Sequence, residues 1–276
     1  MDADDFRSVL YTVDREGRRR WQYVHVVQGF WRRWRRRLSW FLIAFYVVLP
    51  FLHIGGERVL HIDIPQRHYV ILGHVFWPQD AFFLLLLALM GVIGTLLAVS
   101  LFGRVFCGWF CPHNVFLEFV FRPVERLLEG SAPRRKRQDQ GPTTAGLALR
   151  KGVKYALYVI IAWGLANTFI ALFLSGQAHR EDFLLGILVD PSLHPAAFIA
   201  WIIAAGLILF NFAWFREQTC TIVCPYGRLQ AVMLDRDTLT VAYDSQRGEP
   251  RGPKKPDQEG DCIDCGLCQV VCPTGL

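Results

Sequence analysis

The sequence predicts an all-α polytopic membrane protein with four transmembrane helices, and three observations support this fold class. The mean hydropathy of the 276 residues is positive, at +0.26, and only 20% of them are charged. Four stretches are long and apolar enough to cross a hydrocarbon core that needs about 20 residues of helix. Lys and Arg are distributed unevenly between these stretches. The low charge and the 21 Phe and 9 Trp exclude a disordered, collagen-like or small disulfide-stapled chain.

The four predicted spans contain no Asp, Glu, Lys or Arg: Leu38–Ile54, Ala81–Phe102, Tyr155–Leu174 and Pro195–Phe215. The first is the shortest and carries Pro50 near its end. A fifth apolar run, Phe183–Val189, is too short to cross and is interpreted as interfacial.

The distribution of Lys and Arg predicts the orientation. Ten precede the first span, and the four following segments hold two, ten, one and seven. Basic residues favour the cytoplasmic side, so both termini and the middle loop should lie on the cytoplasmic side of a bacterial inner membrane. The cluster Trp31–Arg37 could indicate nucleic-acid binding, but Arg and Trp before a span are typical membrane anchors, so no nucleic-acid partner is expected. No cleavable signal peptide is visible.

The predicted organisation is a tandem repeat. A basic arm (1–37) precedes a first helix pair (38–129), whose Val115–Leu128 segment is expected to lie along the inner membrane surface. A linker (130–154) and a second helix pair (155–234) follow. Residues 235–260 should form a short strand, Leu239–Tyr243, and another linker, before a cysteine-rich segment at 261–276.

The outer loops combine possible strands with histidines. Val59–Ile64 and Tyr69–Phe76 alternate in polarity and could form a hairpin. Six of the eight histidines face the outside in this topology, where a copper capture site is chemically reasonable. Their spacing is irregular, which favours ordinary surface histidines: His53, His61, His68, His74, His179 and His194.

The cysteines lie on the cytoplasmic side of this topology, where thiols stay reduced. Cys262, Cys265, Cys268 and Cys272-Pro273 form the C-x2-C-x2-C-x3-C-P pattern of bacterial ferredoxins. The spacing predicts ligands of a 4Fe-4S cluster rather than zinc, and the fourth cysteine of such a run usually serves a second cluster.

The other four cysteines form a duplicated C-x3-C-P motif. Cys107 and Cys111 follow the second span, and Cys220 and Cys224 follow the fourth span 113 residues later. A parallel 2+2 repeat of helix pairs would bring the motifs together at the inner surface. Four thiolates there could bind Cu(I) or a second iron–sulfur cluster. Arg104 and Arg216 are expected to lower the pKa of the thiols.

With these motifs assembled, the chain resembles the FixG/CcoG/RdxA family of membrane-bound polyferredoxins, accessory factors of cbb-type cytochrome oxidase. The resemblance rests on the strings Phe76–Asp80, Gly103–Pro112, Arg216–Cys220, Cys224–Gly227, Met233–Leu239, Arg247–Pro253 and Asp261–Cys265. Family membership implies two 4Fe-4S clusters and reduction of cupric ion for oxidase assembly. The family continues beyond Cys272 into a second cysteine motif, a span and an outer domain, so this chain is expected to be a fragment.

The resemblance implies a cupric reductase, and the residues leave two alternatives open. In the leading hypothesis, electrons from a cytosolic donor pass through the cluster at Cys262, Cys265 and Cys268 to copper near the C-x3-C-P motifs. The alternatives are a quinol-linked electron-transfer subunit without copper chemistry and a non-catalytic Cu(I)-binding scaffold that works with oxidase assembly factors.

Overall fold

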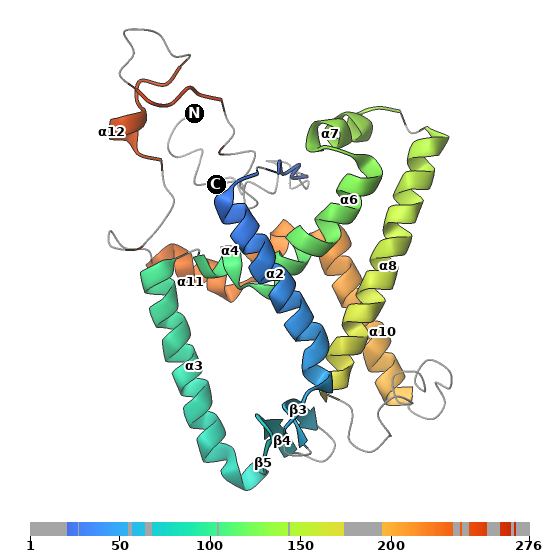
Figure 1. The fold of residues 1–276 in the computed structure, drawn as a ribbon, viewed down its shortest axis with the longest axis vertical. Coiled ribbons are helices and arrows are strands. Elements are labelled where there is room, and N and C mark those ends of the chain that lie inside the picture. Colours follow the sequence, from blue (N-terminus) through green and yellow to red (C-terminus); the bar gives the residue numbers. More distant parts are fainter. Residues whose placement is uncertain are drawn as a thin grey trace.

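The computed structural model describes residues 21–26, 28–54, 57–63, 68–103, 105–142, 144–173, 195–233, 238, 243–252, 260–265 and 268. Long helices connect two ends of the molecule (Figure 1). The short strands lie at one end of the molecule, which we call the strand end (Figure 1). The short helices α4 (Val105–Trp109) and α11 (Pro225–Met233), which belong to the C-x3-C-P motifs, lie at the opposite end of α3 (Ala81–Phe102), and we call this region the motif end.

Three helices are long and apolar enough to cross a membrane: α3 (Ala81–Phe102), α8 (Ala145–Phe173) and α10 (Pro195–Phe210), the last continued by the π-helical turn η4 (Asn211–Phe215). These confirm the second, third and fourth predicted segments as apolar helices. Helix α3 packs mainly against short helices at the motif end, and most of its described side chains are exposed to the surroundings. A membrane would cover such a surface.

The first predicted span differs from the structure. Helix α2 (Phe30–Val48) begins directly before the basic cluster and contains all of it, and a 3-10 turn, η1 (Leu49–Phe51), ends the helix. Pro50 and the strand that follows leave Leu38–Val48 as the apolar part of the helix, which is shorter than the roughly 20 residues of a full crossing. Within the described residues, three helices rather than four therefore meet the length and hydropathy of a span.

The loop after α2 forms a small sheet, so the fold is not purely helical. Strands β3 (Leu60–Asp63) and β4 (His68–Ile71) pair antiparallel, which confirms the predicted hairpin, and β4 also pairs with β5 (His74–Phe76). Strands β1 (His53–Ile54) and β2 (Glu57–Arg58) form a second pair. His61 is buried, with its Nδ1 3.1 Å from the carbonyl oxygen of Leu172 near the end of α8.

The segment between α3 and α8 is largely helical in its described parts. It contains α4 (Val105–Trp109), α5 (Pro112–Phe116), the π-helical η3 (Leu117–Phe121), α6 (Arg122–Glu129) and α7 (Ala132–Gln140). The segment 130–154, for which we predicted a linker, holds α7 and the start of α8. The segment Val115–Leu128 also does not behave as a surface helix, since Glu118, Arg122 and Glu125 are buried and Leu127 is 83% exposed.

An aromatic core holds this segment against the spans. Phe121 stacks on Phe212 with ring centroids 4.5 Å apart, and Tyr158 packs edge-on against Phe121. Phe116 and Leu117 complete the buried cluster. The core therefore joins η3 to α8 and to the end of α10.

After α10 the chain forms the π-helical η5 (Thr219–Val223), α11 (Pro225–Met233) and the short α12 (Ser245–Gly248). The predicted linker after Asp244 is folded back on itself: the Asp244 side chain caps α12, and the Gly252 N–H donates to the carbonyl of Cys262. The predicted strand Leu239–Tyr243 falls largely outside the described residues. Five further features of the sequence analysis lie wholly outside the described residues: the interfacial run Phe183–Val189, Arg104, Cys272, His179 and His194.

Candidate metal centre

The two C-x3-C-P motifs have the same backbone conformation. Gly103 and Arg216, each four residues before the first cysteine, have φ and ψ of 49° and −118°, and 48° and −115°. Cys111 and Cys224, each before the proline, have −61° and 118°, and −66° and 115°. In both motifs the N–H of the second cysteine donates five residues back, to Phe106 or Thr219. The 113-residue repeat therefore extends from the sequence to the local fold.

The motifs also bind each other reciprocally. His113 follows the first motif, and its Nε2 lies 3.0 Å from the carbonyl oxygen of Arg216. Tyr226 is the matching residue after the second motif, and its hydroxyl donates to the carbonyl of Gly103 over 3.2 Å. Each hydrogen bond thus runs from one motif to the residue that ends the helix before the other. This confirms that the motifs meet at one end of the spans.

The four thiols of the two motifs are half-buried, and they lie close enough for Cys220 to feel the charges of the other three. Cys107 lies in α4, Cys111 directly before α5, Cys220 in η5 and Cys224 directly before α11. Burial raises the pKa of the Cys220 thiol to about 12, and electrostatic repulsion from Cys111, Cys107 and Cys224 adds to the shift. The Tyr226 pKa is also raised, first by burial and then by Cys107, Cys111 and Cys224.

The ionisation of these thiols bears on whether the site suits a metal ion or an iron–sulfur cluster. Four neighbouring thiols cannot ionise together unless a cation compensates their charge, and bound metal deprotonates thiols outright. The donor set of sulfur atoms suits Cu(I) or an iron–sulfur cluster. Within the described part of the chain, no three His, Cys, Asp or Glu side chains are already gathered around a common point as metal ligands. The residues fit such a group by their chemistry and their electrostatic coupling.

Arg216 does not have the predicted role of lowering the pKa of the thiols. Its guanidinium donates to both carboxylate oxygens of Glu125, at 2.6 and 3.1 Å, and the Cys220 pKa is raised rather than lowered. Burial opposes ionisation of Glu125, but Arg216 and Arg135 outweigh it and lower its pKa to about 2. The arginine therefore neutralises a buried carboxylate.

This pair belongs to a buried network of charges. Arg122 bridges Glu118 and Glu217, Arg135 donates to Glu125, and Lys154 of α8 donates to Glu129 over 2.6 Å. Arg32 of α2 reaches Glu118 over 2.9 Å. Buried charges are retained only when they are paired. The network therefore links α2, α6, α7, α8 and the start of the second motif.

The sequence analysis missed His113, Tyr226 and two neighbours that stand at matching positions. Asn114 Nδ2 donates to the carbonyl of Cys107 over 2.7 Å. At the matching Gly227, an added Cβ would lie 2.6 Å from the carbonyl oxygen of Cys220, so this position admits only glycine. Shifting the sequence by 113 residues aligns His113 with Tyr226 and Gly103 with Arg216, a signal that could have identified them.

The ferredoxin-type cysteines are less enclosed. Cys262 is half-buried, while Cys265 and Cys268 are exposed. The N–H of Asp261 donates to the carbonyl of Arg247, and Arg247 Nε donates to the Asp261 carboxylate over 2.7 Å. These contacts anchor the beginning of the cysteine run to α12.

Comparisons with known proteins agree with these features. Residues 215–276 match the 4Fe-4S dicluster domain family, and residues 84–135 match the 4Fe-4S binding domain family. The chain is 32% identical to protein RdxA of Cereibacter sphaeroides over 87% of this chain and 52% of RdxA. It is 32% identical to nitrogen fixation protein FixG of Rhizobium meliloti, over 100% and 54% of the two chains. No solved structure matches.

A more distant relative is ferredoxin-type protein NapH of Escherichia coli, with 25% identity over 89% of each chain. The apolar helices and the two 4Fe-4S domains define the class: a membrane-associated 4Fe-4S electron-transfer protein. Within this class, the chain belongs to the FixG/RdxA family. It spans about half the length of RdxA and FixG.

Proposed function

We propose that this chain reduces Cu(II) to Cu(I) at the cytoplasmic face of the bacterial inner membrane, for assembly of cbb-type cytochrome oxidase. Each Cu(II) takes up one electron, which originates from a cytosolic donor. The proposal is supported chiefly by the reciprocal pairing of the C-x3-C-P motifs, which contain Cys107, Cys111, Cys220 and Cys224. Soft thiolates prefer Cu(I), so a site of this kind favours the reduced ion.

In this proposal the two cysteine sets have different tasks. Cys262, Cys265, Cys268 and Cys272 would hold a 4Fe-4S cluster, which supplies one-electron storage when bound. The motif cysteines would hold copper. His113 and Tyr226 fix the distance between the two halves of the thiol site, and Glu125 compensates the charge of Arg216.

A second candidate function has its own supporting observation. The match to the 4Fe-4S binding domain family covers residues 84–135, which contain only two cysteines, Cys107 and Cys111. This favours a second cluster, rather than copper, at the motif cysteines. The protein would then be a quinol-linked electron-transfer subunit without copper chemistry. A non-catalytic Cu(I) scaffold is the third possibility.

An anaerobic titration tests these functions. Reduced protein is mixed with Cu(II), while cluster absorbance reports oxidation and a colorimetric chelator reports Cu(I). The cupric reductase predicts that absorbance changes in proportion to the Cu(I) formed. Oxidation by a quinone with no response to Cu(II) would contradict the reductase and support the second candidate. Binding of added Cu(I) without any reduction of Cu(II) would support the scaffold.

A further inference from the structure

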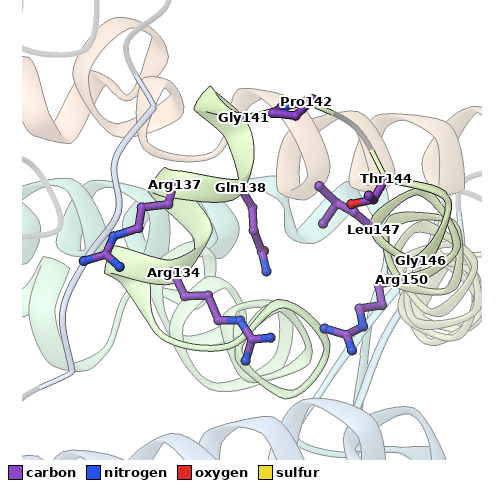
Figure 2. A pocket seen from close by; sticks show the side chains of 9 residues that line it. All are labelled: Arg134, Arg137, Gln138, Gly141, Pro142, Thr144, Gly146, Leu147 and Arg150. Atoms are coloured by element: carbon purple, nitrogen blue, oxygen red, sulfur yellow. The ribbon is translucent and has the colours of Figure 1, made fainter.

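We propose that a cavity between α7 and the first turns of α8 binds a phosphate group, supplied by the headgroup of an anionic lipid. The cavity has a volume of about 500 Å³ and is lined by Arg134, Arg137 and Arg150, with no Asp or Glu in its wall. The guanidinium groups of Arg134 and Arg150 reach toward one another, with the Gln138 amide between α7 and α8 above them (Figure 2).

The cations of this cavity differ in their pairing from three basic neighbours that are held by carboxylates. Arg135 pairs with Glu125, Lys151 with Asp139 and Lys154 with Glu129, whereas the exposed Lys136 has no ion pair among the described residues. Across the described residues, the three arginines of the cavity form no ion pair. Positive charges that converge without a counterion repel each other, so a bound anion would lower the energy of this arrangement.

The remaining wall also suits a phosphate. Helix α8, with 29 residues, begins at Ala145 beside the cavity, and the free N–H groups and dipole of a helix start favour anions. The Gln138 Oε1 atom is buried and finds no hydrogen-bond partner among the described residues. Turning this amide would leave an NH2 donor in its place. Guanidinium forks bind phosphate oxygens in pairs, which adds specificity to the charge.

The position of the cavity along the membrane normal favours a lipid as the source of the phosphate. Tyr155 begins the uncharged part of α8, and Tyr is typical of the membrane–water boundary. Arg150 precedes it by five residues of helix, which corresponds to a rise of about 7.5 Å. The polar headgroup layer is roughly 5–8 Å thick on each side of the hydrocarbon core. Arg150 therefore lies at headgroup depth.

Thermal unfolding with added ligand tests the proposal. The full chain in an uncharged detergent is titrated with short-chain phosphatidylglycerol, short-chain phosphatidylcholine, or inorganic phosphate. The wild type should unfold several degrees higher with phosphatidylglycerol than with phosphatidylcholine. The variant R134Q/R150Q should bind phosphatidylglycerol about tenfold more weakly, because each lost guanidinium removes a charge-assisted contact.

The matched control is R36Q/K136Q, which removes the same charge from exposed residues that do not line the cavity. This control should bind like the wild type and keep its midpoint without ligand. Without ligand, R134Q/R150Q should unfold no lower than the wild type, because the variant removes the repulsion between the two guanidinium groups. Equal losses in the two variants would show unspecific attraction to the basic surface and overturn the site. Stabilisation by inorganic phosphate equal to that by phosphatidylglycerol would overturn the lipid as the source. These outcomes do not depend on copper or on the clusters.

Discussion

At the scale of single residues, Arg216 shows how the site combines strain with compensation. Its φ of 48° lies in a region that glycine occupies easily and that costs other residues about 1–3 kcal/mol. The matching position in the first motif is Gly103. Arg216 tolerates the conformation because Glu125 and the ring of Trp21 hold its guanidinium, the latter at 5.8 Å. The strained residue thus pairs with a carboxylate and presents its carbonyl to His113.

The shared site predicts non-additive mutations. Cys111→Ser and Cys224→Ser should each abolish most cupric-reductase activity, and the double variant should be hardly worse than either, because residues that act as one unit lose their function together. Initial rates of Cu(I) formation measure this, with protein abundance in the membrane as the control. Mild losses that simply add would indicate that these cysteines only pack, and the copper proposal would fail.

His113 predicts a pH dependence of stability. Burial lowers its pKa below the ordinary value of 6.5, and its hydrogen bond to the Arg216 carbonyl only partly offsets this. The unfolded chain then binds the proton at higher pH than the folded chain, so this stability is complete above about 6.5 and is lost as the pH falls. Neutral His113 donates from Nε2 to Arg216, while Asn211 Nδ2 donates to its Nδ1.

The measurement is the unfolding midpoint from about pH 7.5 to about 5.5. His113→Gln keeps an NH2 donor for the Arg216 carbonyl but cannot titrate, so its midpoint should fall less over this range. His74→Gln alters an exposed histidine at the strand end and should keep the wild-type slope. An unchanged slope in the His113 variant would assign the pH dependence to other groups.

At the scale of elements, the paired charges predict unequal costs for two lysines on α8. Lys154→Ala should lower the free energy of unfolding by about 3 kcal/mol, because Glu129 would remain buried and unpaired. Lys151 pairs with Asp139 at a site where both side chains are about one-third exposed, so Lys151→Ala should cost less than about 1 kcal/mol. Chemical denaturation of the two variants compares them, and equal costs would refute a buried network.

The elements also show how far sequence reasoning reaches. Apolar runs predicted α3, α8 and α10, because a membrane span is defined by its own composition. Helix α7 escaped prediction because Gly130, Pro133 and four successive cations resemble a loop, whereas the Arg135–Glu125 contact that holds it comes from the tertiary fold. Periodicity identified a polar face on Val115–Leu128, but it cannot reveal that this face packs against Arg216.

The candidate site, like the fold, could be predicted only in part from the sequence. Spacing alone brought attention to all eight cysteines, since metal-binding motifs are local. The contacts of His113 and Tyr226 join residues about one hundred positions apart, so only the fold could place them. The role of Arg216 was misjudged because proximity in sequence to Cys220 suggested a partner, while its guanidinium points to Glu125.

At the scale of the whole molecule, the arrangement of the ends predicts the topology. The strands around residue 60 lie at one end, and α7, with residue 135, lies at the other (Figure 1). Reporter fusions after residues 60 and 185 should be active outside the cytoplasm, and those after 135 and 255 inside it. Alkaline phosphatase and green fluorescent protein fusions distinguish the two sides. A cytoplasmic reporter at 60 would show that α2 does not carry the chain across.

The reciprocal hydrogen bonds between the motifs also bear on ancestry. Two identical subunits around a twofold axis form each contact twice. Residue i of one subunit meets residue j of the other, and residue j of the first meets residue i of the second. His113 with Arg216, and Tyr226 with Gly103, follow this rule at a constant offset of 113 residues. A half-length progenitor with a single C-x3-C-P motif could therefore have assembled the complete four-thiol site as a homodimer.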